Sequence, residues 1–314
     1  MTRKALDLTT TLRPRLPSPL QPVEDERFSR HGVRLLLKRD DLIHPDLPGN
    51  KWRKLLPSLK AAAGRPLLTF GGAYSNHLRA TAAAGRLLGF ETIGIVRGDE
   101  LASRPLNPSL SRCAADGMRL HFVDRATYRR KADPDVLAGL LRPFGDCFVV
   151  PEGGTNALAA ESCTALGAEL QDRAEVVAVA CGTGGTLAGL AAGLAPGQRA
   201  IGFPVLKGGF LGEAITGLQR EAFGGPAGDW SLDDRFHCGG YARMTPELTA
   251  FADDFRDRHG LTVERVYVAK MLYGLTVLAA EGVFPPGTAV AAVITGQDSF
   301  GVGQTPGEYQ ESSR

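Results

Sequence analysis

Short apolar segments alternate with segments of helical periodicity along almost the whole chain, and this alternation limits the possible folds more than any other feature. The apolar segments are continuous runs, which is typical of parallel strands covered by helices on both faces. A length of 314 residues favours two domains. The sequence therefore predicts an α/β protein with two domains, each a parallel sheet between layers of helices. The expected strands are 33–38, 67–70, 91–98, 118–124, 147–150, 176–180, 200–205 and 290–295.

Helical periodicity fills most of the intervals between these strands. Pro108 at a first helical position and Gly64 after a last one are typical boundary residues. Residues 1–32 are rich in Pro, Arg and Thr and are expected to be extended or irregular. The expected helices are 53–63, 77–89, 107–117, 128–141, 157–170, 187–194, 209–222, 246–259 and 271–281.

The composition excludes several classes of partner. With 43% apolar residues, 22% charged residues and a formal net charge of +2, no strong field points to nucleic acid or to a membrane surface. No run resembles a secretory signal or is long enough to span a membrane. The cysteines are scattered without a CxxC pair, which indicates free thiols, no metal site and a cytoplasmic location. They are Cys113, Cys147, Cys163, Cys181 and Cys238.

Every unusual motif follows an expected strand directly. GGAYSNH follows 67–70, PEGGTN follows 147–150, CGTGGT follows 176–180 and TGQDS closes the last strand. In parallel sheets, ligands bind outside the carboxyl ends of the strands. These motifs are therefore candidates for a single ligand site.

The segment Gly182, Thr183, Gly184, Gly185 and Thr186 has the composition of a phosphate-binding loop. Glycines let backbone N–H groups converge on an anion, and the helix that follows adds its positive end. The alternative is a tight strand-to-helix turn without a ligand. The motif matches neither GxGxxG nor GxxxxGK[ST], so dinucleotide and ATP sites are disfavoured.

Other candidate residues have ordinary structural interpretations as well. Lys51, in LPGNKWRKL, could form a Schiff base, but a single lysine is usually a solvated surface charge. Ser75 could bind a carboxylate or simply cap a helix, and His77 is ambiguous. Tyr241 and Tyr267 could relay protons or be half-buried core aromatics.

Five stretches, taken in order, resemble the D-cysteine desulfhydrase and 1-aminocyclopropane-1-carboxylate deaminase family. They are GNKWRKL, GGAYSNHLRATAAAG, GTGGTLAGL, GGYARMTPE and VYVAKMLYGL. The resemblance runs from about residue 35 to 300. It implies a pyridoxal-phosphate (PLP) enzyme of the tryptophan synthase β-like fold (fold type II), and a homodimer.

The resemblance also implies residue roles. Lys51 would carry the cofactor and remove the substrate Cα proton, in a pocket that lowers its pKa. The loop from Gly182 to Thr186 would hold the cofactor phosphate. Asn50 and Asn76 would lie beside the cofactor ring, with Asn76 bound to its phenolic oxygen, and Thr295 would lie near the pyridine nitrogen. The substrate carboxylate would bind to Ser75, Asn76 and His77. Tyr241 and Tyr267 would line the substrate side.

Departures from the family pattern bear on the substrate. His77, and Val268 in place of an acid after Tyr267, favour the desulfhydrase side over ring opening. Gln297 replaces a glycine that is usual there, and its amide could add a hydrogen bond to the substrate. A hydroxyl from Thr295 on the ring nitrogen would leave a weaker electron sink than a carboxylate would, which suits prompt β-elimination.

The sequence thus predicts a PLP-dependent lyase that acts on a small amino acid, converting D-cysteine to pyruvate, hydrogen sulfide and ammonia. The alternatives are 1-aminocyclopropane-1-carboxylate deamination, D-serine-type dehydration, and a non-catalytic PLP-binding protein. Residues 1–49 and 156–314 are expected to form a large cofactor-binding domain, and residues 50–155 a small inserted domain.

Overall fold

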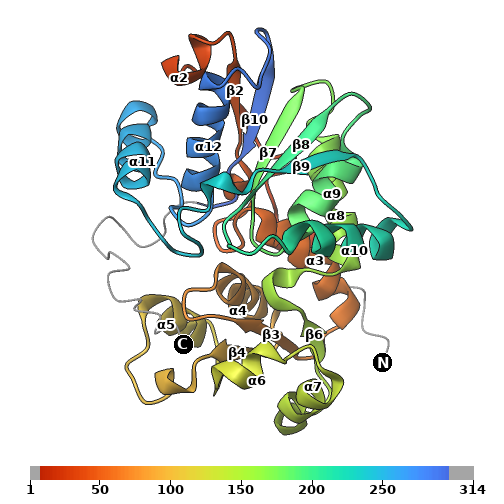
Figure 1. Cartoon of the computed structure of the whole chain (residues 1–314). Helices are drawn as coiled ribbons and strands as arrows, with labels where there is room; N and C mark the ends of the chain where they lie inside the picture. Colours follow the sequence, from red (N-terminus) through yellow and green to blue (C-terminus); the bar gives the residue numbers. More distant parts are fainter. Residues whose placement is uncertain (1–7, 297–314) are drawn as a thin grey trace.

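The computed structural model describes residues 8–296, in which the strands form two sheets (Figure 1). The larger sheet has the order β1-β2-β10-β7-β8-β9 and is parallel except for the antiparallel pair of β1 and β2. Its strands are β1 (Leu20–Val23), β2 (Arg34–Lys38), β7 (Val176–Cys181), β8 (Arg199–Pro204), β9 (Asp229–Leu232) and β10 (Ala289–Val293).

The smaller sheet has four parallel strands in the order β5-β4-β3-β6 and occupies the lower part of Figure 1. Its strands are β3 (Leu67–Gly71), β4 (Thr92–Arg97), β5 (Met118–Val123) and β6 (Phe148–Val150). The two sheets confirm the predicted α/β class. The one antiparallel strand among the described residues, β1, lies at an edge of the larger sheet.

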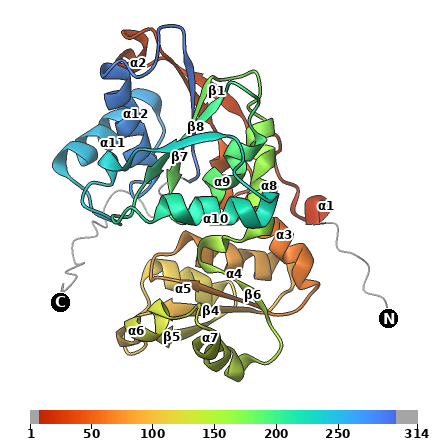
Figure 2. The same cartoon turned by 45° about the vertical axis from the view of Figure 1, so that its right-hand side comes forward.

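Helices cover both faces of each sheet (Figure 2). On β7 of the larger sheet, Ala178 packs into the core under α11 and α12, whereas Val177 and Val179 pack into the core under α8, α9 and α10. Because successive residues of a strand face opposite sides, a strand covered on both sides must be apolar throughout. The helices are α1 (Leu8–Leu12), α2 (Glu26–Ser29), α3 (Asn50–Ala62), α4 (Asn76–Leu88), α5 (Pro108–Ala115), α6 (Arg125–Arg129), α7 (Pro134–Leu141), α8 (Ala157–Ala168), α9 (Gly185–Gly193), α10 (Leu211–Phe223), α11 (Pro246–His259) and α12 (Val268–Ala280).

The structure corrects several expected elements. Residues 1–32 were expected to be extended or irregular, yet the helices α1 and α2 lie there together with the strand β1. β1 contains Pro22, which an edge strand tolerates because one side of it needs no ladder hydrogen bonds. β9, at the other edge, was also not predicted. The single helix expected over 128–141 is two helices, because Pro134 cannot continue α6 and instead starts α7.

A buried ion-pair cluster fixes the start of α3 against the larger sheet. The Arg53 guanidinium donates at 2.8 Å to both carboxylate oxygens of Asp40, and at 2.9 Å to both oxygens of Glu169. Glu169 also pairs with Lys38 of β2 at 2.6 Å. Buried charges need such partners because an unpaired one is costly to desolvate. The cluster therefore holds the helix turn that carries Lys51.

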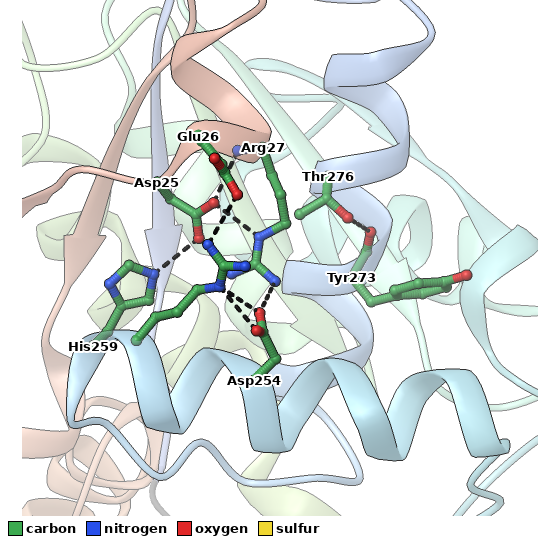
Figure 3. A network of polar contacts seen from close by, with 8 residues as sticks. Asp25, Glu26, Arg27, Asp254, His259, Tyr273 and Thr276 are labelled. Atoms are coloured by element: carbon green, nitrogen blue, oxygen red, sulfur yellow. Dashed lines mark hydrogen bonds and ion pairs between the residues drawn. The ribbon is translucent and has the colours of Figure 1, made fainter.

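A second cluster joins the segment around α2 to α11 (Figure 3). The carboxylate of Asp25 accepts a hydrogen bond from Nε of Arg27 at 2.8 Å and lies 2.9 Å from Nε2 of His259. Arg27 also donates to Asp254 at 2.8 Å. These contacts attach the N-terminal part of the chain to a helix more than two hundred residues later.

In the part of the chain that the structure describes, no helix is long and apolar enough to cross a membrane. Over the same residues, no group of His, Cys, Asp and Glu side chains is arranged to hold a metal ion. The five cysteines are free thiols.

Candidate active site

The motifs at the carboxyl ends of the strands in both sheets line one cavity of about 930 Å³. Every predicted site residue within the described range lines it, and Gln297 lies outside that range. From the sequence analysis, these lining residues are Asn50, Lys51, Ser75, Asn76, His77, Gly182, Thr183, Gly184, Gly185, Thr186, Tyr241, Tyr267 and Thr295.

Lys51 lies in the first turn of α3, half-buried in the cavity wall. Gly49, just before the helix, has φ +64°, and a Cβ there would lie 1.8 Å from the carbonyl oxygen of Thr295. Only glycine allows this approach of α3 to the end of β10. Burial lowers the pKa of the Lys51 amine to about 8, which increases the neutral, nucleophilic fraction at physiological pH.

The loop after β7, which the sequence predicted to hold the cofactor phosphate, lines the cavity as a cradle at the start of α9. Gly184 adopts the left-handed conformation (φ +81°) and α9 begins at the next residue, so the helix N-terminus faces the cavity. The Thr183 hydroxyl lies 2.5 Å from that of Thr155. Thr186 accepts a hydrogen bond from the Asn50 amide at 2.9 Å, which ties the cradle to the start of α3.

Lys54 also lines the cavity, although no sequence pattern singled it out. Its ammonium donates to Thr155 Oγ1 at 2.7 Å and to Thr183 Oγ1 at 3.4 Å, so it lies under the phosphate cradle. Burial, and to a smaller extent the charge of Lys51, lower the pKa of Lys54 to about 7. The sequence did contain one signal for this role. Lys54 follows Lys51 by three positions, and residues three apart share one face of a helix.

The start of α4 presents Ser75, Asn76 and His77 to the cavity. Ser75 is the N-cap, and its hydroxyl accepts the N–H of Leu78 at 3.2 Å. Asn76 accepts a hydrogen bond from the guanidinium of Arg79. His77 is 2% exposed, and its Nε2 lies 2.7 Å from the Thr69 hydroxyl.

Two tyrosines in the cavity lining pack against each other. The rings of Tyr241 and Tyr267 pack edge to face with centroids 6.1 Å apart. Burial raises the pKa of Tyr267 well above its ordinary value, so its hydroxyl keeps its proton. Glu264, a further lining residue that sequence analysis missed, accepts the backbone N–H groups of Val266 and Tyr267 at 2.9 and 2.7 Å.

The family model described as "Pyridoxal-phosphate dependent enzyme" matches residues 13–296. The chain belongs to this family. It is therefore a PLP-dependent enzyme of the fold that the sequence predicted. The residues at the cavity fit the cofactor, because a lysine of lowered pKa stands beside a cradle that offers hydroxyls, a helix N-terminus and a second buried ammonium to a phosphate.

Curated relatives carry both names that the resemblance suggested. A putative 1-aminocyclopropane-1-carboxylate deaminase of Pyrococcus horikoshii is 29% identical over 80% of this chain and 81% of that protein. The D-cysteine desulfhydrase of Klebsiella pneumoniae (strain 342) is also 29% identical, over 82% of this chain and 85% of that one. A solved structure titled as an ACC deaminase homologue superimposes with a TM-score of 0.76 at 25% identity, covering 92% of this chain and 94% of that chain.

Proposed function

We propose that this enzyme eliminates a β-substituent from a small amino acid in the manner of a D-cysteine desulfhydrase. D-cysteine and water would give pyruvate, hydrogen sulfide and ammonia. One observation carries the proposal: Lys51, the N-terminus of α4 and the Tyr241–Tyr267 pair line a single cavity. A base, a carboxylate-binding element and proton-bearing hydroxyls are the groups that an elimination requires.

The residues divide the work as follows. The N-terminus of α4 binds the substrate carboxylate, since backbone N–H groups and the helix dipole favour an anion there. Once transferred from Lys51 to the substrate amine, PLP would delocalise the negative charge at Cα and leave the Lys51 amine free. The neutral Lys51 amine takes the Cα proton. A Cα–Cβ double bond then forms, and the Cβ–S bond breaks with its electron pair on sulfur. The Tyr241 or Tyr267 hydroxyl donates a hydrogen bond to the leaving thiolate, and the proton that Lys51 removed from Cα protonates the sulfur.

Other roles inferred from the family remain part of this proposal. Thr295 would stand near the pyridine nitrogen, Asn76 near the phenolic oxygen, and Gln297 near the substrate. For His77, the contact with Thr69 engages the one ring N–H, so its backbone N–H is the better donor to a carboxylate. The domain boundaries at 49/50 and 155/156, the homodimer and the cytoplasmic location also remain proposals.

The test has two stages. Holoenzyme should show an imine chromophore that borohydride bleaches and that Lys51→Ala lacks, with Lys60→Ala, on the exposed face of α3, as the matched control. Sulfide and 2-oxo acid are then measured from D- and L-cysteine, D-serine and 1-aminocyclopropane-1-carboxylate. D-cysteine should give both products. Release of 2-oxobutanoate from the cyclopropane substrate alone would favour the deaminase, and a chromophore without turnover would favour a non-catalytic binding protein.

A further inference from the structure

Arg97 is a cavity residue that has no place in the reaction described above. It is the last residue of β4, its side chain is exposed, and it lines the cavity. Its Nη2 lies 3.6 Å from the position that a Cβ on Gly72 would occupy. The guanidinium therefore stands beside the loop between β3 and α4, which ends in the predicted carboxylate-binding residues.

No carboxylate within residues 8–296 forms an ion pair with Arg97. Its guanidinium instead lies over the ring of Tyr128, 6.0 Å from the centroid. Tyr128 is buried, and its hydroxyl donates to Glu152 at 2.8 Å, which fixes the ring. Glu152 is in turn paired with Lys131 at 2.9 Å. An aromatic ring thus positions Arg97 without neutralising its charge.

Two other arginines line the cavity and have partners within the protein: Arg79 donates to Asn76, and Arg112 pairs with Asp46 and Asp116. The remaining cationic groups of the cavity have partners within the proposed reaction. Lys51 carries the cofactor, Lys54 lies at the phosphate cradle, and the N-terminus of α4 faces the substrate carboxylate. Arg97 lines the same cavity as Tyr241, and it is close enough that its charge lowers the pKa of Tyr241, against the larger effect of burial. One positive charge on the substrate side is thus left without an assigned anion.

We propose that Arg97 binds a negative charge on the β-substituent of the substrate, so that the preferred amino acids carry a second anionic group at or beyond Cβ. The inference rests on the proposed elimination and names its substrate class. A planar guanidinium suits phosphate, sulfonate or carboxylate oxygens, which it binds with two parallel hydrogen bonds.

O-phosphoserine is one amino acid of this class, and its elimination would proceed in the following way. Lys51 takes the Cα proton, the Cα–Cβ double bond forms, and the Cβ–O bond breaks with its electron pair on the phosphate oxygen. Water then releases the three-carbon product as pyruvate and ammonia. The sum is O-phosphoserine and water giving pyruvate, ammonia and phosphate, with no oxidant or reductant.

The experiment compares two esters of serine in both enantiomers, O-phosphoserine and the uncharged O-acetylserine, by 2-oxo acid release from holoenzyme below pH 7. Arg97→Gln should lower kcat/KM for O-phosphoserine about tenfold relative to O-acetylserine, as expected for a partly exposed charge-assisted contact. Arg97→Lys should recover part of the loss. Arg125→Gln, which removes an exposed arginine paired with Glu100 at 2.7 Å outside the cavity, is the matched control.

A binding measurement separates charge recognition from leaving-group chemistry. Aspartate carries a carboxylate on Cβ but no leaving group. It should bind to wild-type holoenzyme more tightly than alanine does, as measured by the change in cofactor absorbance. Arg97→Gln should abolish this difference in affinity. Equal losses for both esters would assign Arg97 to the α-carboxylate and overturn the proposal, as would turnover of O-acetylserine with no response to either anionic ligand. If no amino acid yields a 2-oxo acid, the proposed elimination itself fails.

Discussion

The Thr69 hydroxyl determines which nitrogen of the His77 ring carries the proton. It donates its one proton to the carbonyl oxygen of Val150 at 2.7 Å and lies 2.7 Å from Nε2 of His77. Nε2 must therefore be the donor, and Nδ1 is an acceptor. Among the residues that the structure describes, Nδ1 has no hydrogen-bond partner. Nδ1 of His77, which lies near Lys51 and Lys54, can therefore accept a hydrogen bond from the bound cofactor or substrate.

The His77 ring should remain neutral through the physiological range. Burial lowers its pKa well below 6.5, with the charges of Lys51 and Lys54 acting in the same direction. In ¹⁵N-resolved NMR of apo-enzyme, the ring should stay in the Nε2–H form as the pH falls through 6.5. Thr69→Val should lower the free energy of unfolding by about 1–3 kcal/mol, because it leaves a buried N–H unpaired. A ring that titrates at its ordinary pKa would contradict the assignment.

Lys54→Met should weaken cofactor binding while sparing the imine at Lys51. Loss of one charge-assisted contact to a phosphate corresponds to about a 10- to 100-fold rise in Kd. Without the cofactor, the same change should leave stability unchanged or increase it, because it removes a desolvated ammonium whose pKa is lowered to about 7. Equilibrium dialysis and thermal unfolding of both forms check this pair of effects.

Lys60→Met is the matched control for that experiment, since Lys60 is on the same helix and exposed. It should change neither cofactor affinity nor the stability of the apo-enzyme by a measurable amount. Similar effects of the two substitutions would show that the charge of Lys54 is not specific to the cradle.

Capture of PLP by apo-enzyme should become faster as the pH rises toward 8 and then level off. Only the neutral amine attacks an aldehyde, and burial lowers the pKa of Lys51 to about 8. Below that value, the rate of imine formation, followed by stopped-flow absorbance, should rise about tenfold per pH unit. A rate that keeps rising toward pH 10.5 would indicate a solvated lysine instead.

The cluster around Asp25 should make the protein sensitive to acid (Figure 3). Burial raises the pKa of this carboxyl, but hydrogen bonds from Arg27 and His259 outweigh burial and hold it well below 3.8. The stabilisation is therefore fully present above pH 4 and is lost as the pH falls further. Asp25→Asn should lower the free energy of unfolding by about 3 kcal/mol at pH 7, with the deficit shrinking below pH 4.

Asp257→Asn is the control for the acid experiment, because Asp257 is exposed on the same helix as His259 and pairs only with Arg256 among the residues described. Such a surface pair contributes about 0–1 kcal/mol. Denaturant unfolding across pH 2–8 checks both variants, and a deficit of Asp25→Asn that does not change with pH would refute a role for its ionisation.

The sequence determined the class of fold and the order of the motifs, because these depend on local patterns. The buried strands β7 and β10 are continuous apolar runs, β3 is apolar apart from Thr69, and a motif of glycine and polar residues follows each of them. Strand ends in a parallel sheet lie at one edge, so the motifs could be expected to meet in one place. All site residues predicted within the described range do line one cavity.

Only the tertiary structure decided which residues touch across that cavity. The partner of Lys54 is Thr155, 101 positions later, and no local period links the two. The edge strands β1 and β9 lack continuous apolar runs, because their residues are half-buried or exposed. Among the residues that the structure describes, each pairs with only one neighbouring strand, and this pairing, not a local pattern, makes it a strand. Likewise, only the fold determines that no carboxylate within residues 8–296 forms an ion pair with Arg97. The sequence shows that an arginine can form an ion pair, but the packing of distant segments determines whether it does.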